Sequence, residues 1–184
     1  MGAYSKAYLD EVIENQGKLF DYVAATYPDS DTEDFIRSYM KSDTRKYVDE
    51  AQAYVCTMDA RDLWEYFLQT DRYEMKRGVA LGGFVPDWIG EFYAYYQWHF
   101  NIPSRIVVEK IPPEYLKKAY AGLHDLDLEL AVKKLGSCEA PVTFSSFPPQ
   151  MHSFRQTVYT VSGNLFFLRF WCKAPLLSVR GVFV

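Results

Sequence analysis

Residues 84–100 read FVPDWIGEFYAYYQWHF, a segment that is apolar almost throughout and crowded with aromatic rings. Pro86 disfavours a helical conformation at the residue before it and Asp87 is a good N-cap, so the pattern predicts a helix from about 87 to 100. Ring-bearing and apolar side chains fill two adjacent stripes of that helix: Trp88, Phe92, Tyr95 and His99, and Ile89, Tyr93, Tyr96 and Phe100. A helix without a clear polar face is usually surrounded by other helices. We therefore expect this segment to form the centre of the fold.

Amphipathic patterns predict six or seven short helices in residues 1–136, forming a mainly α-helical, compact bundle around this central helix. Besides 87–100, the expected segments are 4–27, one following Asp31, a helical turn at 45–50, 60–70, 104–110, one opening at Pro113, and 128–135. Gly17 should weaken the first helix by about 1 kcal/mol relative to alanine. Gly136 stands where a left-handed residue commonly follows a helix, so the last helix is predicted to stop there.

The composition is that of one domain with a substantial core. Of 184 residues, 49% are apolar and 17% aromatic, which excludes wholesale disorder. The net charge of −4 gives no general attraction to nucleic acid or anionic membranes. The N-terminal residues lack the apolar run of a signal peptide, and no apolar stretch approaches the ~18 residues needed to cross a bilayer. We expect a soluble, cytoplasmic protein with no membrane span.

The residue types that hold metals and cofactors are sparse. The three cysteines, Cys56, Cys138 and Cys172, are widely spaced and lack metal-ligand spacing, so free thiols in a reducing compartment are expected. The chain has three histidines and no HExxH motif, and it contains neither a phosphate-binding loop nor a GxSxG nucleophile motif. The sequence therefore predicts no metal and no cofactor.

The composition changes near Gly136. Residues 1–136 hold 23 acidic and 16 basic side chains, whereas residues 137–184 hold one acid and four bases. Within this tail, residues 157–161 and 165–171 flank a Ser-Gly-Asn turn and predict a β-hairpin. Two interpretations stay open. Either the hairpin covers one face of a helical domain, 1–136, or residues 137–184 are a non-native extension produced by readthrough or a frameshift.

The middle of the chain resembles a group of bacterial proteins. The segments FIRSYM, DWIGEFYAYYQW, NIPS, EKIPPEYL and AYAGLHDLDLELAVKKL are similar to short uncharacterised bacterial proteins whose genes often lie beside toxin–antitoxin-like or mobile-element genes. The resemblance covers residues 32–135 and brings no established activity and no catalytic residues. It implies an interaction or accessory role with a partner protein encoded nearby.

The strongest candidates for a binding site are Trp88, Glu91, Tyr95, Trp98 and His99 on the central helix. Glu91 and Tyr95 are four residues apart and share a face, close to both tryptophans. A carboxylate flanked by rings could bind a cation or a small polar ligand through cation–π contact. The competing interpretation, which we favour, is that the rings form the core and that the helix dipole stabilises Glu91.

An enzyme would have to use Glu91 or His124, and a small hydrolase or transferase is the second functional hypothesis. Asp125 could orient His124 as a base; alternatively His124 ends a helix, and Asp125 or Asp127 caps the next one. Glu91 and His99 lie two helical turns apart, about 12 Å along the axis, which is too far for a direct acid/base pair.

A third hypothesis is nucleic-acid binding through residues 104–120, where two short helices are joined by a tight turn. Lys117 and Lys118 could reach phosphates, but two lysines in an acidic domain provide little electrostatic attraction for nucleic acid.

The hypothesis that we place first is a bacterial or phage module that binds another protein. Exposed aromatic side chains on the central helix and its neighbours would make the contact.

Overall fold

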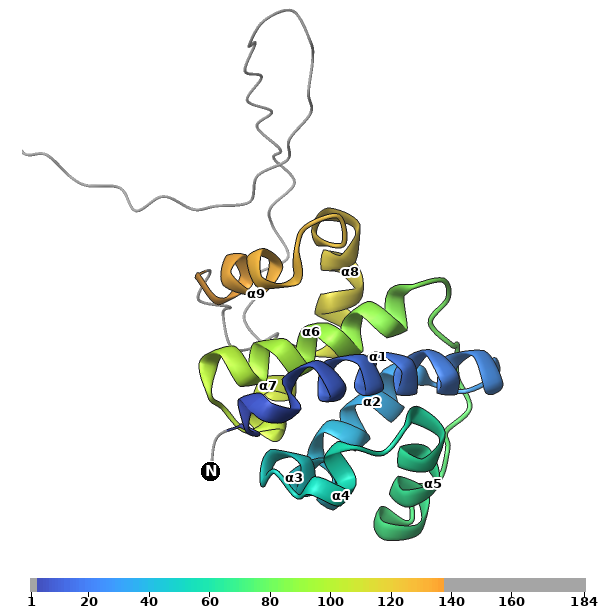
Figure 1. Ribbon diagram of the computed structural model, residues 1–184. Helices are drawn as coiled ribbons and strands as arrows, with labels where there is room; N and C mark the ends of the chain where they lie inside the picture. Colours follow the sequence, from blue (N-terminus) through green and yellow to red (C-terminus); the bar gives the residue numbers. More distant parts are fainter. Residues whose placement is uncertain (1–2, 138–184) are drawn as a thin grey trace, which may run out of the picture. The chain divides into compact units, whose positions relative to one another are not determined.

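The computed structural model describes residues 3–137, which form nine α-helices and no β-strand (Figure 1). In chain order they are α1 (Leu9–Thr26), α2 (Thr32–Lys41), α3 (Asp43–Asp49), α4 (Ala53–Cys56), α5 (Ala60–Asp71), α6 (Val85–Phe100), α7 (Ser104–Lys110), α8 (Pro113–Leu123) and α9 (Leu128–Ser137). A 3-10 turn, Lys6–Tyr8, precedes α1. The mainly helical fold is confirmed. The predicted number of helices was too low, because the turn at 45–50 is a full helix and α4 is too short for a sequence pattern to reveal. The predicted hairpin and tail lie outside the described residues.

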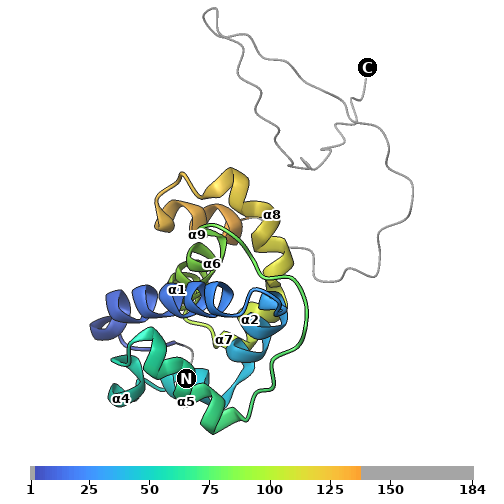
Figure 2. The ribbon, with the colours of Figure 1, turned by 90° about the vertical axis from the view of Figure 1, so that its right-hand side faces the viewer.

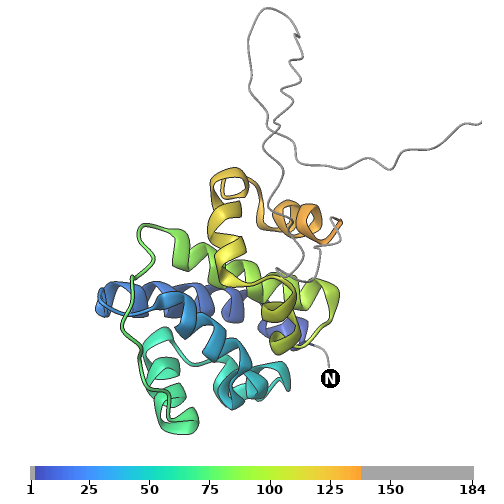
Figure 3. The same ribbon diagram turned by 180° about the vertical axis from the view of Figure 1, so that it is seen from behind.

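The helices are arranged around the antiparallel pair α1 and α6. The Tyr4 hydroxyl donates to the Ala94 carbonyl, and the Gln16 amide donates to the Gly90 carbonyl, so α1 runs along α6 in the opposite direction. Figures 1 and 3 show α8 and α9 on one side of this pair and α2 to α5 on the other. α6 therefore has neighbours on several sides, as the distribution of its aromatic residues predicts.

The interior position of α6 is confirmed by the burial of its side chains. Ile89, Phe92, Tyr93 and Ala94 have no exposed surface, and Trp88 is only 7% exposed. The start of the helix was predicted two residues too late. α6 begins at Val85 with Phe84 as its N-cap, and Pro86 lies in the first turn. A proline is tolerated there because the first amides of a helix have no partner within the helix.

Gly136 has a different role from the one predicted. α9 continues through Gly136 to Ser137 instead of ending in a left-handed residue. A β-carbon at Gly136 would lie 2.2 Å from Cζ of Phe100, at the end of α6. A larger residue at this position would require the Phe100 ring to move, because the ring lies close to the α9 backbone. No signal in the local sequence distinguishes this contact from a helix stop.

Candidate functional site

Trp88 belongs to the core, as the favoured interpretation of the central helix required. Its ring lies 5.3 Å from the ring of Phe92 and 5.5 Å from Tyr120 of α8, the latter in an edge-to-face arrangement. Since only 7% of the side chain is exposed, Trp88 fixes α8 against α6. It is not positioned as an open wall of a ligand cage.

Glu91 lies against α1. A β-carbon placed on Gly17 would be 2.9 Å from Cγ of Glu91 and 2.7 Å from Oδ1 of Asp87. Burial raises the pKa of Glu91, and the neighbouring charges of Asp87 and Glu14 raise it further. The carboxylate therefore faces a helix-helix junction rather than a cluster of rings.

Asp87 stands one turn earlier at the same junction. Burial and the charge of Asp21 raise its pKa, while Lys18 acts in the opposite direction. Lys18 is itself ion-paired with Glu14. We call the four carboxylates along this junction, Glu14, Asp21, Asp87 and Glu91, the acidic seam.

Tyr95, Trp98 and His99 form a second, half-buried group on the last two turns of α6. The Tyr95 ring lies 5.7 Å from Trp98 and stacks nearly parallel to His99 at 6.0 Å. Within residues 3–137, Trp88 has no direct ring contact with these three residues and is linked to His99 through the rings of Phe92, Tyr96 and Phe100. The five predicted binding residues are therefore divided between the core, the α1 junction and this group. Ligand binding by them stays a prediction.

His124 ends α8 and has partners for both ring nitrogens. Nδ1 lies 2.9 Å from the Tyr120 carbonyl, to which it can donate, and Nε2 lies 3.2 Å from Oδ1 of Asp125. The imidazole also stacks on the Tyr120 ring at 4.5 Å. Asp127, one of the two predicted caps, accepts from the amide of Glu129 at the start of α9. The helix-end geometry matches the structural interpretation, and a catalytic role for His124 stays a prediction.

Residues 104–120 form the two short helices that the nucleic-acid hypothesis requires. Lys117, one of its two candidate phosphate contacts, is ion-paired with Glu33 of α2 at 2.9 Å. A lysine already paired with a carboxylate must exchange that partner to bind phosphate, so this geometry does not add to the hypothesis.

A buried polar network, which no sequence pattern indicated, lies at the junction of α3, α6 and α7. Arg45 has no exposed surface; its guanidinium donates to Oδ1 of Asp49 at 3.0 Å and to Oε1 of Gln97 at 2.7 Å. Oδ2 of Asp49 accepts from the backbone amide and the hydroxyl of Ser104 at 3.0 and 2.9 Å. The Tyr4 ring covers the guanidinium at 5.5 Å.

The network joins three helices through one carboxylate. An arginine and an aspartate four residues apart are also a common surface pair, so the spacing of Arg45 and Asp49 did not reveal their burial. Beside the network is a surface pocket of about 250 Å³ lined by Ser42, Lys46, Asp49, Glu50, Pro103, Ser104 and Arg105. Its charged side chains are of both signs, which gives the pocket no clear preference for an anion or a cation.

Two apolar side chains stand out of the connector between α5 and α6. Val79 is 82% exposed and Phe84 is 78% exposed. The connector's backbone is nevertheless held: the Asp31 amide donates to the Lys76 carbonyl at 2.9 Å, and the Gly78 amide donates to the Asp29 carbonyl at 3.0 Å. Figure 2 shows this connector as a long arc along one edge of the bundle. The sequence pattern predicts Phe84 to be part of a buried segment, and its exposure follows from its place just before the first turn of α6.

The end of the connector is anchored as well. The Leu81 amide donates to the Thr32 hydroxyl at 3.2 Å, and the Leu81 side chain is buried. Gly83 has a left-handed φ of 63°, which redirects the chain into α6 at little steric cost. The backbone that carries Val79 and Phe84 is thus fixed on both sides of Val79.

Cys56 is a buried free thiol 3.8 Å from the Val48 carbonyl. Burial raises its pKa to about 11, so the reactive thiolate is scarce near neutral pH. Within residues 3–137, no three histidine, cysteine or acidic side chains come together in a way that could hold a metal ion. In the same part of the chain, none of the helices has the length and apolar character needed to span a membrane.

Comparisons with known proteins add no relative. No protein-family model, no curated protein and no solved structure matches this chain.

Proposed function

We propose that this chain acts by binding another protein, as an accessory module in a toxin–antitoxin-like setting. The observation that carries the proposal is the exposure of Val79 and Phe84 on a connector whose backbone is anchored. The setting follows only from the resemblance of residues 32–135 to bacterial proteins encoded beside such genes.

A large apolar side chain held in water is stabilised when a partner covers it. Full burial of a ring such as Phe84 contributes about 1.5–3 kcal/mol, and aromatic residues often dominate the free energy of protein–protein binding. Because the Lys76 carbonyl and the Gly78 and Leu81 amides are already hydrogen-bonded to residues 29–32, docking would order little additional backbone. Such pre-organisation leaves more of the contact energy for affinity.

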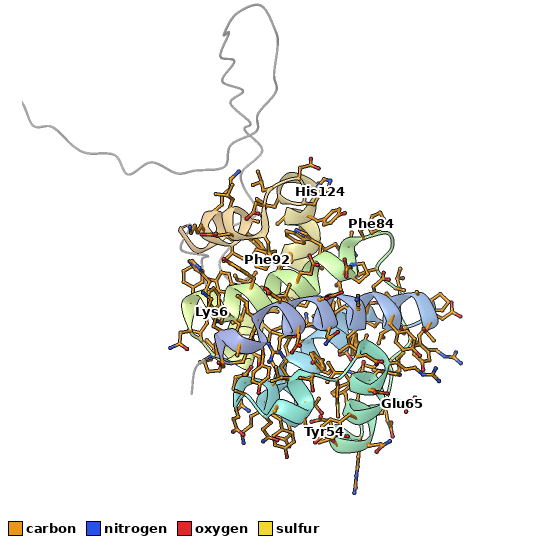
Figure 4. All side chains as sticks on the ribbon, viewed as in Figure 1. Lys6, Tyr54, Glu65, Phe84, Phe92 and His124 are labelled. Atoms are coloured by element: carbon orange, nitrogen blue, oxygen red, sulfur yellow. The ribbon has the colours of Figure 1, made fainter. Side chains whose placement is uncertain are left out.

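The aromatic residue that supplies the contact differs from our expectation. Trp88 is in the core, so the proposed anchor is Phe84, immediately before the helix. Figure 4 shows Phe84 at the periphery of the bundle, whereas Phe92 lies on the inner part of α6. The first turn of α6 directly follows Phe84 and contains buried residues, so it fixes the position of the Phe84 backbone.

The test is co-purification from the native host with three forms of the tagged full chain as bait. The test form carries Val79→Ser and Phe84→Ser. A matched control carries Tyr54→Ser, which removes another exposed ring, 71% exposed on α4. We expect a protein that binds the wild-type chain and the Tyr54 control, and whose affinity for the double variant, measured with purified components, is at least about tenfold lower.

Two results would overturn the proposal. One is recovery of every bait as a free monomer in cells that express the neighbouring genes. The other is a partner that binds the double variant as tightly as the wild-type chain, while circular dichroism shows that all three forms are folded.

A further inference from the structure

We infer that the partner presents a basic segment with an apolar anchor, which packs on Phe84 and Val79 and lies along the acidic seam. The inference rests on the proposed function, because it assigns chemistry to the partner for the same surface. It goes further in naming the charge of that partner and the side chains that recognise it.

The acidic seam begins next to the exposed ring. Asp87 follows Phe84 by three residues, a spacing that makes side chains neighbours at the start of a helix. Gly17 brings the α1 backbone against Asp87, and Asp21, one turn further along α1, is exposed and adds its charge to the same place. An apolar anchor on Phe84 would therefore place its neighbouring side chains within reach of these carboxylates.

The charges of the seam are poorly compensated within the domain. Lys18 is the cation that acts on Asp87, but its ammonium is paired with Glu14. Among residues 3–137, neither Asp21, Asp87 nor Glu91 takes part in an ion pair. Partial burial and, after it, repulsion from neighbouring carboxylates raise the pKa values of Asp87 and Glu91, as expected of carboxylates with little compensating positive charge. A lysine or arginine from a partner would supply one.

Charge complementarity also distinguishes this occupant from the alternatives. A second copy of the chain meeting this face about a two-fold axis would bring one acidic seam close to the other. Nucleic acid and anionic lipid surfaces would meet the same repulsion. Residues 1–136 carry 23 acids against 16 bases, so attraction of a basic segment also extends beyond the contact itself.

The first experiment measures binding of two synthetic amphipathic peptides to the full chain by fluorescence anisotropy. Both peptides, roughly 14 residues long, have the same leucine and tryptophan positions, with lysine at the polar positions of one and glutamate in the other. We expect the lysine peptide to bind at least about tenfold more tightly than the glutamate peptide. Its affinity should fall at least about fivefold between about 50 mM and about 500 mM NaCl.

Variants distinguish the seam from general attraction to an acidic protein. Asp21→Asn with Asp87→Asn removes two charges from the seam; Asp62→Asn with Glu65→Gln removes two exposed charges from α5. Figure 4 shows Glu65 on α5, at a different part of the molecule from Phe84. We expect the seam variant to bind the lysine peptide at least about fivefold more weakly, and the α5 control to stay within about twofold of the wild-type affinity.

Three results overturn the inference. They are no binding of the lysine peptide up to about 1 mM, equal weakening by the seam and α5 variants, and equal affinity for both peptides. Sedimentation that shows a dimer lost only in the Val79→Ser, Phe84→Ser variant would instead assign this face to a second copy. The proposed function would survive if a purified native partner needs Phe84 but binds the seam variant normally. In that case only the assigned charge of the partner would be wrong.

Discussion

Gly90 of α6 lies directly against Gly17 of α1: a β-carbon on Gly90 would be 2.7 Å from the Cα of Gly17 and 2.5 Å from the carbonyl oxygen of Gln16. Side chains do not approach backbone atoms this closely, so the two helices can pack at this distance only with glycine at position 90. The Gln16 side chain then bridges the same junction by donating to the Gly90 carbonyl at 2.9 Å. Gly17, which weakens α1 when that helix is considered alone, is required by the packing of α1 on α6.

Gly90→Ala should destabilise the domain, although alanine is the better helix former. The new methyl group would force α1 and α6 apart, and overpacking of this kind typically costs about 1–3 kcal/mol. Urea denaturation followed by circular dichroism measures the change in the free energy of unfolding. Gly122→Ala in α8 is the matched control, because nothing lies within 4 Å of its added β-carbon. That variant should be neutral or stabilised by about 0.5–1 kcal/mol, and equal effects of the two changes would contradict the close packing.

Trp88→Ala should reduce the free energy of unfolding by about 3–5 kcal/mol, because it removes a buried ring that packs on Phe92 and Tyr120. Phe84→Ala, one turn earlier and exposed, should change it by less than about 0.5 kcal/mol. Thermal and urea denaturation of both variants provide the comparison. A loss below about 1 kcal/mol for Trp88→Ala would place the ring at the surface and restore the ligand-cage hypothesis.

Asp49→Ala should destabilise the domain by about 3–5 kcal/mol, because the Arg45 guanidinium would keep its charge inside the protein without a carboxylate. Glu50→Ala, at the next position, removes an exposed ion pair with Lys46 and a long, exposed hydrogen bond from the Gln52 amide, and should cost less than about 0.5 kcal/mol. The double change Arg45→Met with Asp49→Leu should lower the free energy of unfolding by less than the sum of the losses caused by Arg45→Met and Asp49→Leu made separately. Additive losses in urea denaturation would show that the two charges do not depend on each other.

The stability contributed by Asp87 should depend on pH in the direction opposite to that of most salt-bridged carboxylates. Because burial and Asp21 raise its pKa in the folded state, the protonated form is favoured in the native protein. Its contribution is complete below the unfolded-state pKa, near 3.8, and is lost as the pH rises through the higher folded-state value. Asp87→Asn should therefore be more stabilising, or less destabilising, at pH 7 than at pH 3.

Denaturation of Asp87→Asn at the two pH values gives this difference directly, because effects of the amide that are independent of pH cancel. Glu65→Gln on α5 serves as the exposed control, for which we expect a change of less than about 0.5 kcal/mol between the same pH values. If Asp87→Asn is instead more stable, relative to the wild-type chain, at pH 3 than at pH 7, the folded protein stabilises the charged form of the Asp87 carboxylate.

Much of the helical pattern is visible in the sequence because helix signals are local. Asp31 accepts from the amide of Asp34 at the start of α2, and Asp59 accepts from the amides of Arg61 and Asp62 at the start of α5, as capping residues do. The errors concern contacts between distant segments. Gly136 lies within α9, where the Phe100 ring from the end of α6 packs close to it. The start of α6 at Val85, before Pro86, is the exception, because it depends on the local tolerance of proline in a first helical turn.

The candidate site was less predictable for the same reason. The sequence singled out rings on the central helix, but burial separates Trp88 from Phe84, only four residues earlier. No local pattern could show that residues 29–32 hold the connector backbone or that Arg45 is enclosed. Exposure depends on which segments pack over a residue, and those segments lie far along the chain.

The amino-acid sequence by itself determined that this protein is mainly helical and that its ring-rich helix lies inside, since periodicity and capping act over a few residues. Only the tertiary structure decided which aromatic residue remains in water, where the acidic side chains of α1 and α6 meet, and why glycines occur within helices. Those properties depend on how closely two backbones approach and on the desolvation of charges brought together. Both are set by long-range packing.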